Sequence, residues 1–252
     1  MRQRRAKNME ERLQECGKYL INDPSPEALK GCFGGDGDLF LEIGCGKGQF
    51  IIKKALENSD SNFVAIEGQE AVMLRALEKC AVLNGAIVTN EDTEGQIEFL
   101  RRIKDASYDE DAEVLENLRF ICKFVNGMDE LFGESSLSGV YLNFSDPWPK
   151  ARHNKRRLTY RGRLMDYVWA LKPGGFIEIK TDNEGLFEFT LEEIASCQEE
   201  HPEAGMKICQ MTRDLHSEAC DYESKKTMTE YETKFSSNGK NINYVKVIAE
   251  KR

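Results

Sequence analysis

The chain has 252 residues, a formal net charge of -9 and a pI near 5.1. This length suits one large α/β core or at most two small domains, and the acidic balance excludes a protein that coats nucleic acid through its global charge. Apolar runs stop short of the roughly 20 residues that a membrane helix needs, and charge rather than a signal sequence follows Met1. We therefore expect a soluble, cytoplasmic protein.

The cysteines and histidines show no metal-binding pattern. No two of the eight cysteines have C-x-x-C spacing, and several fall inside apolar runs. The three histidines lie far apart in the sequence. We expect reduced cysteines that pack in the core, and no bound metal.

Residues 1–37 are predicted to form a basic arm and a short helix ahead of the main domain. The basic residues of the arm are Arg2, Arg4, Arg5 and Lys7. Residues 9–20 then repeat apolar side chains with helical spacing. Residues 23–38, rich in Pro, Gly and Asp, are expected to form a loop, and residues 38–252 a single domain.

Strand and helix patterns alternate along this domain. The expected strands are D-L-F-L-E-I before the first glycine, then 62–67, 118–125, 140–144, 176–179, 207–211 and 244–249. The expected helices follow the glycines, cover 71–83 and 159–171, and begin after Asn183 and at Thr229. Residues 84–117 are expected to be a polar insertion on the surface. The alternation predicts an α/β fold with a doubly wound, mostly parallel sheet and helices on both faces.

A glycine motif follows the first strand. Gly44, Gly46 and Gly48 form G-x-G-x-G, in which the missing side chains let a nucleotide-like ligand lie against the backbone. A dinucleotide fingerprint needs its third glycine at the position that Gln49 occupies here, which disfavours NAD. The motif alone is a weak signal.

Two carboxylates flank this motif in the sequence. Glu67, at the end of the second strand, has the spacing of an acid that binds a ribose diol, which both NAD and S-adenosylmethionine (SAM) carry. Glu42, two residues before the first glycine, would attract a sulfonium or amino group and repel a pyrophosphate. The pair favours SAM, although each acid alone is also compatible with a plain surface position.

An acidic turn follows the apolar run 140–144. Asp146 comes where that strand should end, and Pro147 and Pro149 disfavour helical angles at the residues before them, so we expect an extended, stiff exit that includes Trp148. Such a carboxylate, at the carboxyl end of a strand, is in position to orient an acceptor. An ordinary turn former before proline is the alternative.

A basic run comes directly after this turn. Its polar and charged residues are Lys150, Arg152, His153, Asn154, Lys155, Arg156 and Arg157. Five cations within eight residues of an acidic chain favour phosphate binding over a merely solvated face.

Two further segments resemble capping boxes, in which a Thr caps a helix and the Glu three residues later reaches back. They are Thr181–Glu184 and Thr229–Glu232. From the residues alone, each could cap a helix or contact a substrate.

Five segments together resemble one enzyme family, the bacterial tRNA (guanine-N7-)-methyltransferases, or TrmB family. They are M-R-Q-R-R, L-E-I-G-C-G-K-G, Y-L-N-F-S-D-P-W-P-K-A-R-H-N-K-R-R-L-T, K-T-D-N-E-G-L-F and M-T-E-Y-E-T-K-F. The segments are long, in order and spread over nearly the whole chain. The resemblance implies a Rossmann-like, SAM-dependent methyltransferase that modifies a variable-loop guanosine of tRNA to 7-methylguanosine and releases S-adenosylhomocysteine. We expect a monomer or homodimer, and the sequence gives no sign of an obligate protein partner.

The resemblance also implies roles for individual residues. It gives SAM contacts at Glu42 and Glu67, a catalytic carboxylate at Asp146 and RNA contacts along 152–157. Substrate contacts are implied at Lys150, Asp182, Thr229 and Glu232. An adenine contact is expected after the third strand, where F-V-N-G-M-D departs from the family pattern; we assign it to Asn126, with Asp129 as the alternative. The insertion at 84–117 is longer than the resemblance leads us to expect.

The chemistry of guanine N7 limits what the catalytic acid does. Because N7 already has a free lone pair, no general base is needed, and we expect Asp146 to orient the base and stabilise positive charge. The alternatives are a methyltransferase for another RNA guanine and a non-catalytic tRNA-binding protein. An NAD-dependent oxidoreductase is disfavoured by Gln49 and Glu42.

Overall fold

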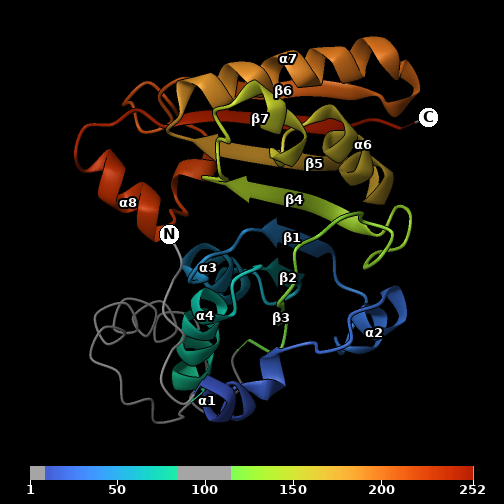
Figure 1. The fold of residues 1–252 in the computed structure, drawn as a ribbon, viewed down its shortest axis with the longest axis vertical. Coiled ribbons are helices and arrows are strands. Elements are labelled where there is room, and N and C mark those ends of the chain that lie inside the picture. The colour runs from blue at the N-terminus through green and yellow to red at the C-terminus, as the bar shows by residue number, and fades with distance from the viewer. Residues whose placement is uncertain (1–8, 85–114, 252) are drawn as a thin grey trace. The chain divides into compact units, whose positions relative to one another are not determined.

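The computed structural model describes residues 9–84 and 115–251 (Figure 1). The chain divides into two compact units, which are described separately. The first comprises 1–38 and 44–125, and the second comprises 39–43 and 126–252. The basic arm and most of the polar insertion at 84–117 lie outside the described residues.

The first unit contains two parallel strands and several helices. Its elements are α1 (Met9–Glu15), the 3-10 helix η1 (Gly17–Tyr19), α2 (Pro26–Gly31), α3 (Gln49–Glu57), β2 (Asn62–Ile66), α4 (Glu70–Leu83) and β3 (Leu118–Ile121). The register of β2 and β3 runs from Phe63 opposite Leu118 to Ile66 opposite Ile121. Both strands and the inner face of α4 are buried, which accounts for their continuous apolar runs.

The second unit contains five strands in the order β1-β4-β5-β7-β6, side by side in Figure 1. The strands are β1 (Leu39–Ile43), β4 (Leu137–Asn143), β5 (Leu171–Thr181), β6 (Met206–Thr212) and β7 (Asn243–Ala249). The helices are η2 (Ala151–Arg156), α6 (Arg161–Ala170), α7 (Glu184–Glu200), η3 (Pro202–Ala204), η4 (Glu223–Lys225) and α8 (Glu230–Ser236). Strands β1, β4 and β5 run parallel, and β7 is antiparallel to both of its neighbours. The expected doubly wound, mostly parallel sheet is confirmed.

One aromatic ring fixes the pairing of β4 with β5. Gly139 lies opposite Phe176, and a Cβ at Gly139 would come within 2.4 Å of that ring. The ring also meets Tyr141 edge-on, with centroids 5.5 Å apart, and the Lys246 ammonium lies 4.0 Å from its centroid. The glycine is therefore required for close packing inside the sheet rather than for a turn.

Several elements differ from those expected. Residues 23–38 are not all loop, because Ser25 caps α2 with its hydroxyl and Pro26 occupies the first helical position. Strand β3 ends at Ile121 rather than at residue 125. Strand β5 begins already at Leu171, and the K-P-G-G segment after it forms an irregularity in its pairing with β4.

The two proposed capping boxes behave differently. In the second box, Thr229 accepts from the Glu232 N–H at 2.9 Å and Glu232 accepts from the Thr229 N–H at 3.3 Å, as predicted. The capping box proposed at Thr181–Glu184 does not form. The cap of α7 is instead Asn183, whose side chain accepts from the Leu186 N–H at 2.8 Å. Thr181 instead accepts from the Asn183 N–H, because its short side chain reaches the backbone two residues on.

A buried ion pair holds the C-terminal part of the second unit to β5. The Lys180 ammonium donates to both carboxylate oxygens of Glu232 at 3.1 Å and to the carbonyls of Ser224 at 2.7 Å and Thr227 at 2.9 Å. The two side chains are 1% and 0% exposed. His216 Nε2 lies 2.8 Å from Glu232 Oε1. Four oxygens surround the ammonium, which offsets much of the free energy of desolvating it.

We predict that Lys180→Met lowers the free energy of unfolding by about 3 kcal/mol or more, because it removes the cation paired with the buried Glu232 and the donor to the buried carbonyls of Ser224 and Thr227. Adding Glu232→Gln should recover part of that loss. Urea unfolding measures the free energy of unfolding of the single and the double variant. The matched control is Lys226→Met, which breaks the exposed pair with Glu223 and should cost under about 1 kcal/mol. Equal costs for Lys180→Met and the control would contradict a stabilising role for the buried pair.

Candidate active site

The glycine motif of the first unit forms a tight turn before α3. The N–H groups of Gly44 and Cys45 both donate to the Ile66 carbonyl, at 2.8 and 3.1 Å, which ties the turn to the end of β2. The φ angles of 80°, 58° and 78° at Gly44, Gly46 and Gly48 lie in the left-handed region. Side chains disfavour that region, which explains the three glycines.

The three glycines differ in what surrounds them. A Cβ at Gly48 would lie 2.6 Å from the Ala76 Cβ, so this glycine lets α3 and α4 approach closely. A Cβ at Gly44 or Gly46 would meet nothing within 4 Å. The backbone at these two positions is open to a ligand, as a cofactor lying against the turn requires.

Glu67 directly follows β2 and is oriented by two backbone donors. Its carboxylate accepts from the Gly46 N–H at 3.1 Å and from the Gln69 N–H at 2.9 Å. A carboxylate has about four acceptor positions, and donors from the described residues occupy two of them, which leaves room for hydroxyl donors such as those of a ribose. The structure therefore brings Glu67 to the glycine turn, as the sequence predicts.

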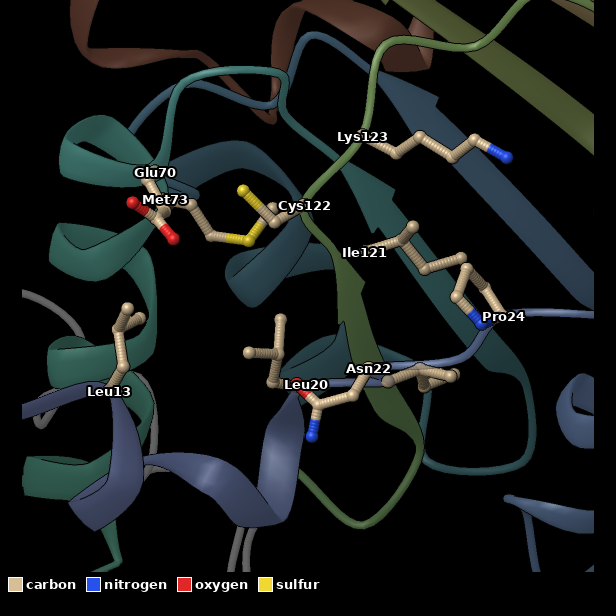
Figure 2. A pocket seen from close by; sticks show the side chains of 10 residues that line it. Leu13, Leu20, Asn22, Pro24, Glu70, Met73, Ile121, Cys122 and Lys123 are labelled. Carbon is tan, nitrogen blue, oxygen red and sulfur yellow. The ribbon is translucent and has the colours of Figure 1, made fainter. Parts of the chain in front are cut away.

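A separate pocket of the first unit is shown in Figure 2. It has a volume of about 280 Å³ and lies among the N-terminal segment, α4 and the end of β3. Leu13, Leu20, Met73 and Ile121 supply apolar walls, and Glu70 is among the polar residues that line it. None of the predicted site residues lines this pocket.

Glu42 belongs to β1 of the second unit and is almost fully buried. Its Oε1 accepts from the Asn143 side-chain amide at 2.8 Å, and Asn143 is itself buried at the end of β4. This amide fixes the orientation of the carboxylate. The sequence analysis missed Asn143, although an amide at the end of an apolar strand, three residues before Asp146, was a usable signal.

The acidic turn carries backbone strain on both sides of Asp146. Phe144 has φ 52° and Trp148 has φ 39°, and such left-handed angles cost non-glycine residues on the order of 1–3 kcal/mol each. The expected extended conformation at Trp148 was therefore wrong, because the surrounding contacts outweigh the local preference before Pro149. Asp146 is exposed, and within the described part of the chain no donor engages its carboxylate.

Most of the basic run forms the 3-10 helix η2, and its cations differ in exposure. Lys150, Arg152, Lys155 and Arg156 are exposed. The Arg156 guanidinium lies 5.1 Å from the centroid of the Trp148 ring, which His153 meets edge-on with centroids 5.7 Å apart. Asn154 accepts the N–H of Arg157 through its backbone carbonyl at 3.1 Å. The exposed cations are open to an anionic partner.

Arg157 is half-buried, unlike the exposed cations of the basic run, and has different contacts. Its Nε donates to the Pro147 carbonyl at 2.9 Å and its Nη2 to the Trp148 carbonyl at 3.1 Å. The guanidinium lies 4.1 Å from the centroid of the Phe189 ring on α7. These contacts connect it to the acidic turn and to α7.

Asp182, just after β5, has two partners that the sequence analysis missed. The Tyr231 hydroxyl donates to its Oδ2 at 3.2 Å, and the Lys240 ammonium pairs with the same oxygen. The hydrogen bond that the Lys240 ammonium donates to Asp182 raises the pKa of Lys240. Burial and the nearby Asp182 charge raise the pKa of Tyr231. Tyr231 stacks on Phe235 at 4.1 Å and packs on Phe144 at 5.0 Å.

Glu232 and Thr229, the other two expected substrate residues, act locally in the structure. Glu232 is fully buried and bound to Lys180, and Thr229 caps α8. Asn126 and Asp129 are both exposed, and the Asn126 carbonyl accepts from Arg163. The choice between Asn126 and Asp129 as adenine contact stays open.

The cysteines are all free, and the described ranges contain no grouping of three or more His, Cys, Asp or Glu that would suit a metal ion. Five cysteines are buried, whereas Cys122 and Cys209 are exposed. None of the helices within the described ranges has the length and apolar character that crossing a membrane requires.

Solved structures of methyltransferases share this fold. A 16S rRNA methyltransferase, KamB, superposes with a TM-score of 0.56 over 91% of this chain and 94% of its own, at 14% identity. An antibiotic-related methyltransferase gives a TM-score of 0.54 over 91% and 96% of the two chains, also at 14% identity. At such identities the likeness concerns the fold alone, and it identifies a Rossmann-like methyltransferase fold.

The sequence comparisons are more specific. Residues 36–245 match a family described as "Putative methyltransferase". A tRNA (guanine-N(7)-)-methyltransferase of Mesoplasma florum is 40% identical over 253 aligned residues, covering 96% of each chain. One of Lachnoclostridium phytofermentans is 35% identical and covers 92% of each chain. From these matches over nearly the full length, together with the glycine turn and the acidic turn, the chain belongs to the tRNA (guanine-N(7)-)-methyltransferase family.

Proposed function

We propose that this protein transfers the methyl group of SAM to N7 of a variable-loop guanosine in tRNA, giving 7-methylguanosine. The observation that carries the proposal is its similarity, over at least nine-tenths of both chains, to relatives that bear this activity as their name. The substrate, tRNA, also accords with the exposed cations of η2. Action in the cytoplasm follows from that substrate.

The cofactor residues proposed are Glu42, Gly44, Gly46, Gly48, Glu67 and either Asn126 or Asp129. The open backbone at Gly44 and Gly46 and the remaining acceptor positions of Glu67 suit a nucleoside with a free ribose diol. Glu42, held by Asn143, provides negative charge for a cationic ligand. When bound, SAM supplies a methyl group activated by its positively charged sulfur.

Asp146 is proposed to act on the guanine rather than to remove a proton. Methylation places positive charge on the ring, and a nearby carboxylate lowers the energy of that charge. The same carboxylate can accept hydrogen bonds from the base edge and hold N7 in line for attack. The Asp146 carboxylate is exposed in the strained turn that follows β4.

Substrate contacts are proposed at Lys150 and Asp182, whereas Thr229 and Glu232 are proposed to support the site from the start of α8. Asp182 lies between Tyr231 and Lys240 and can exchange one of these donors for those of a guanine. Glu232 can only act indirectly, because it is buried against Lys180. It supports Asp182 by holding α8, which carries Tyr231.

We predict that the purified protein transfers labelled methyl from SAM to unmodified tRNA, and that digestion of the product yields the label in 7-methylguanosine alone. The control is the same tRNA transcribed with adenosine in place of the variable-loop guanosine, which should accept no label. Label in another nucleoside would indicate a different RNA methyltransferase. Tight tRNA binding without any transfer would indicate a non-catalytic binding protein.

We predict that Asp146→Asn lowers kcat by about 100-fold or more, because the amide cannot neutralise charge on the ring. The Kd for tRNA should stay within about twofold of the wild type, since phosphate contacts dominate affinity. Single-turnover transfer and filter binding measure the two quantities. Asp221→Asn, at another exposed aspartate of the second unit, is the control and should change neither. Full activity of Asp146→Asn would remove this residue from the mechanism.

We predict that Arg152→Ala and Arg156→Ala each weaken tRNA binding and reduce the slope of log K against log salt by about 1, because each removes a phosphate contact. Titration at four or more salt concentrations gives the slope. Lys207→Ala is the control: it removes an exposed cation on β6, outside the basic run, and should leave the slope unchanged. An unchanged slope in the two arginine variants would place the tRNA elsewhere on the protein.

A further inference from the structure

We infer that Arg157 is a positioning residue for Asp146 and does not bind tRNA. Its guanidinium holds the two carbonyl groups that directly follow Asp146 in the chain and so keeps the acidic turn in its strained, catalytically useful shape. The inference rests on the proposed function only for its kinetic consequences. The geometry behind it lies entirely within the second unit.

The contacts of Arg157 match the shape of its side chain. Two nitrogens of the planar guanidinium donate to successive carbonyls, those of Pro147 at 2.9 Å and Trp148 at 3.1 Å. Its flat face lies against the Phe189 ring, with the guanidinium carbon 4.1 Å from the ring centroid. A lysine ammonium is a point charge that cannot bridge two carbonyls in a fixed plane while also stacking on a ring.

The turn needs such a support. Trp148 has a left-handed φ of 39°, and its side chain is too bulky to adopt that angle without compensation. Arg157 contacts the carbonyl of Trp148 itself and that of the residue before it. Without the guanidinium, the turn would relax toward the extended conformation that Pro149 favours, and the Asp146 carboxylate would move with it.

The helix η2 brings Arg157 back to the turn. The His153 N–H donates to the Lys150 carbonyl at 2.8 Å and the Arg157 N–H to the Asn154 carbonyl at 3.1 Å, so the basic run curls rather than extends. As a result Arg156 and Arg157, adjacent in sequence, contact different parts of the turn. Arg156 is exposed over the Trp148 ring, and Arg157 holds the backbone.

The kinetic test compares Arg157→Lys with Arg213→Lys, a matched control whose guanidinium also lies over a ring of α7, that of Phe187 at 5.4 Å, but away from the acidic turn. Arg157→Lys should lower kcat by roughly 10- to 100-fold, because small displacements of a catalytic group have effects of this size, and should leave the Kd for tRNA within twofold. Arg213→Lys should keep kcat. In the Asp146→Asn background, Arg157→Lys should lower kcat little further, since both changes act on the Asp146 side chain. A weakened tRNA Kd with unchanged kcat in Arg157→Lys would overturn the inference.

A spectroscopic test needs no activity. The chain has two tryptophans, so Trp169→Phe leaves Trp148 as the single fluorescent reporter of the turn. Arg157→Lys in this background should increase acrylamide quenching of Trp148, with the melting temperature measured in parallel, whereas Arg157→Lys with unchanged quenching would overturn the inference. If wild-type protein transfers no methyl group to tRNA, the proposed function fails, and this fluorescence comparison still decides the role of Arg157.

Discussion

The organisation of the second unit depends on one buried positive charge. Lys180, at the end of β5, is 1% exposed, and an ammonium in that position is unstable unless oxygens surround it. The segment between β6 and β7 supplies them, through the carbonyls of Ser224 and Thr227 and the carboxylate of Glu232. A single cation thus determines where a long polar connection can lie. Helix α8 is fixed by the same requirement, and with it the hydroxyl that Tyr231 donates to Asp182.

This dependence explains how Glu232 can matter to the site without touching a substrate. A motif such as M-T-E-Y-E-T-K-F combines residues with different duties: Thr229 and Glu232 cap the helix, Glu232 also neutralises Lys180, and Tyr231 faces the site aspartate. Loss of any one of them would disturb Asp182. Sensitivity to substitution in this segment is therefore expected even for residues that stay inside the protein.

The sequence was sufficient for the alternation of strands and helices, because the buried parallel strands are continuous apolar runs with turn residues between them. It also identified the glycine turn and Glu67, whose spacing follows from a strand-turn-helix-strand order. It could not give Asn143 as the partner of Glu42, since these residues are 101 positions apart and meet only through β1–β4 pairing. Nor did it separate Arg156 from Arg157. Composition describes a run of cations, but the direction of each side chain depends on the curl of η2 and on a ring contributed by α7.

The ring of Phe176 on Gly139 has a consequence for the two site aspartates. Hydrogen bonds between parallel strands are nearly equivalent at neighbouring registers, so the backbone alone allows β4 and β5 to slide past each other. A slide by one residue would drive the Phe176 ring into the side chain of Ser138 or Val140, because the space that it fills exists only at Gly139. The same register sets Asn143 opposite Lys180, at the ends of the strands from which Asp146 and Asp182 emerge. The missing side chain at Gly139, in the middle of the sheet, thereby helps to align the Asp146 and Asp182 carboxylates, which it does not contact.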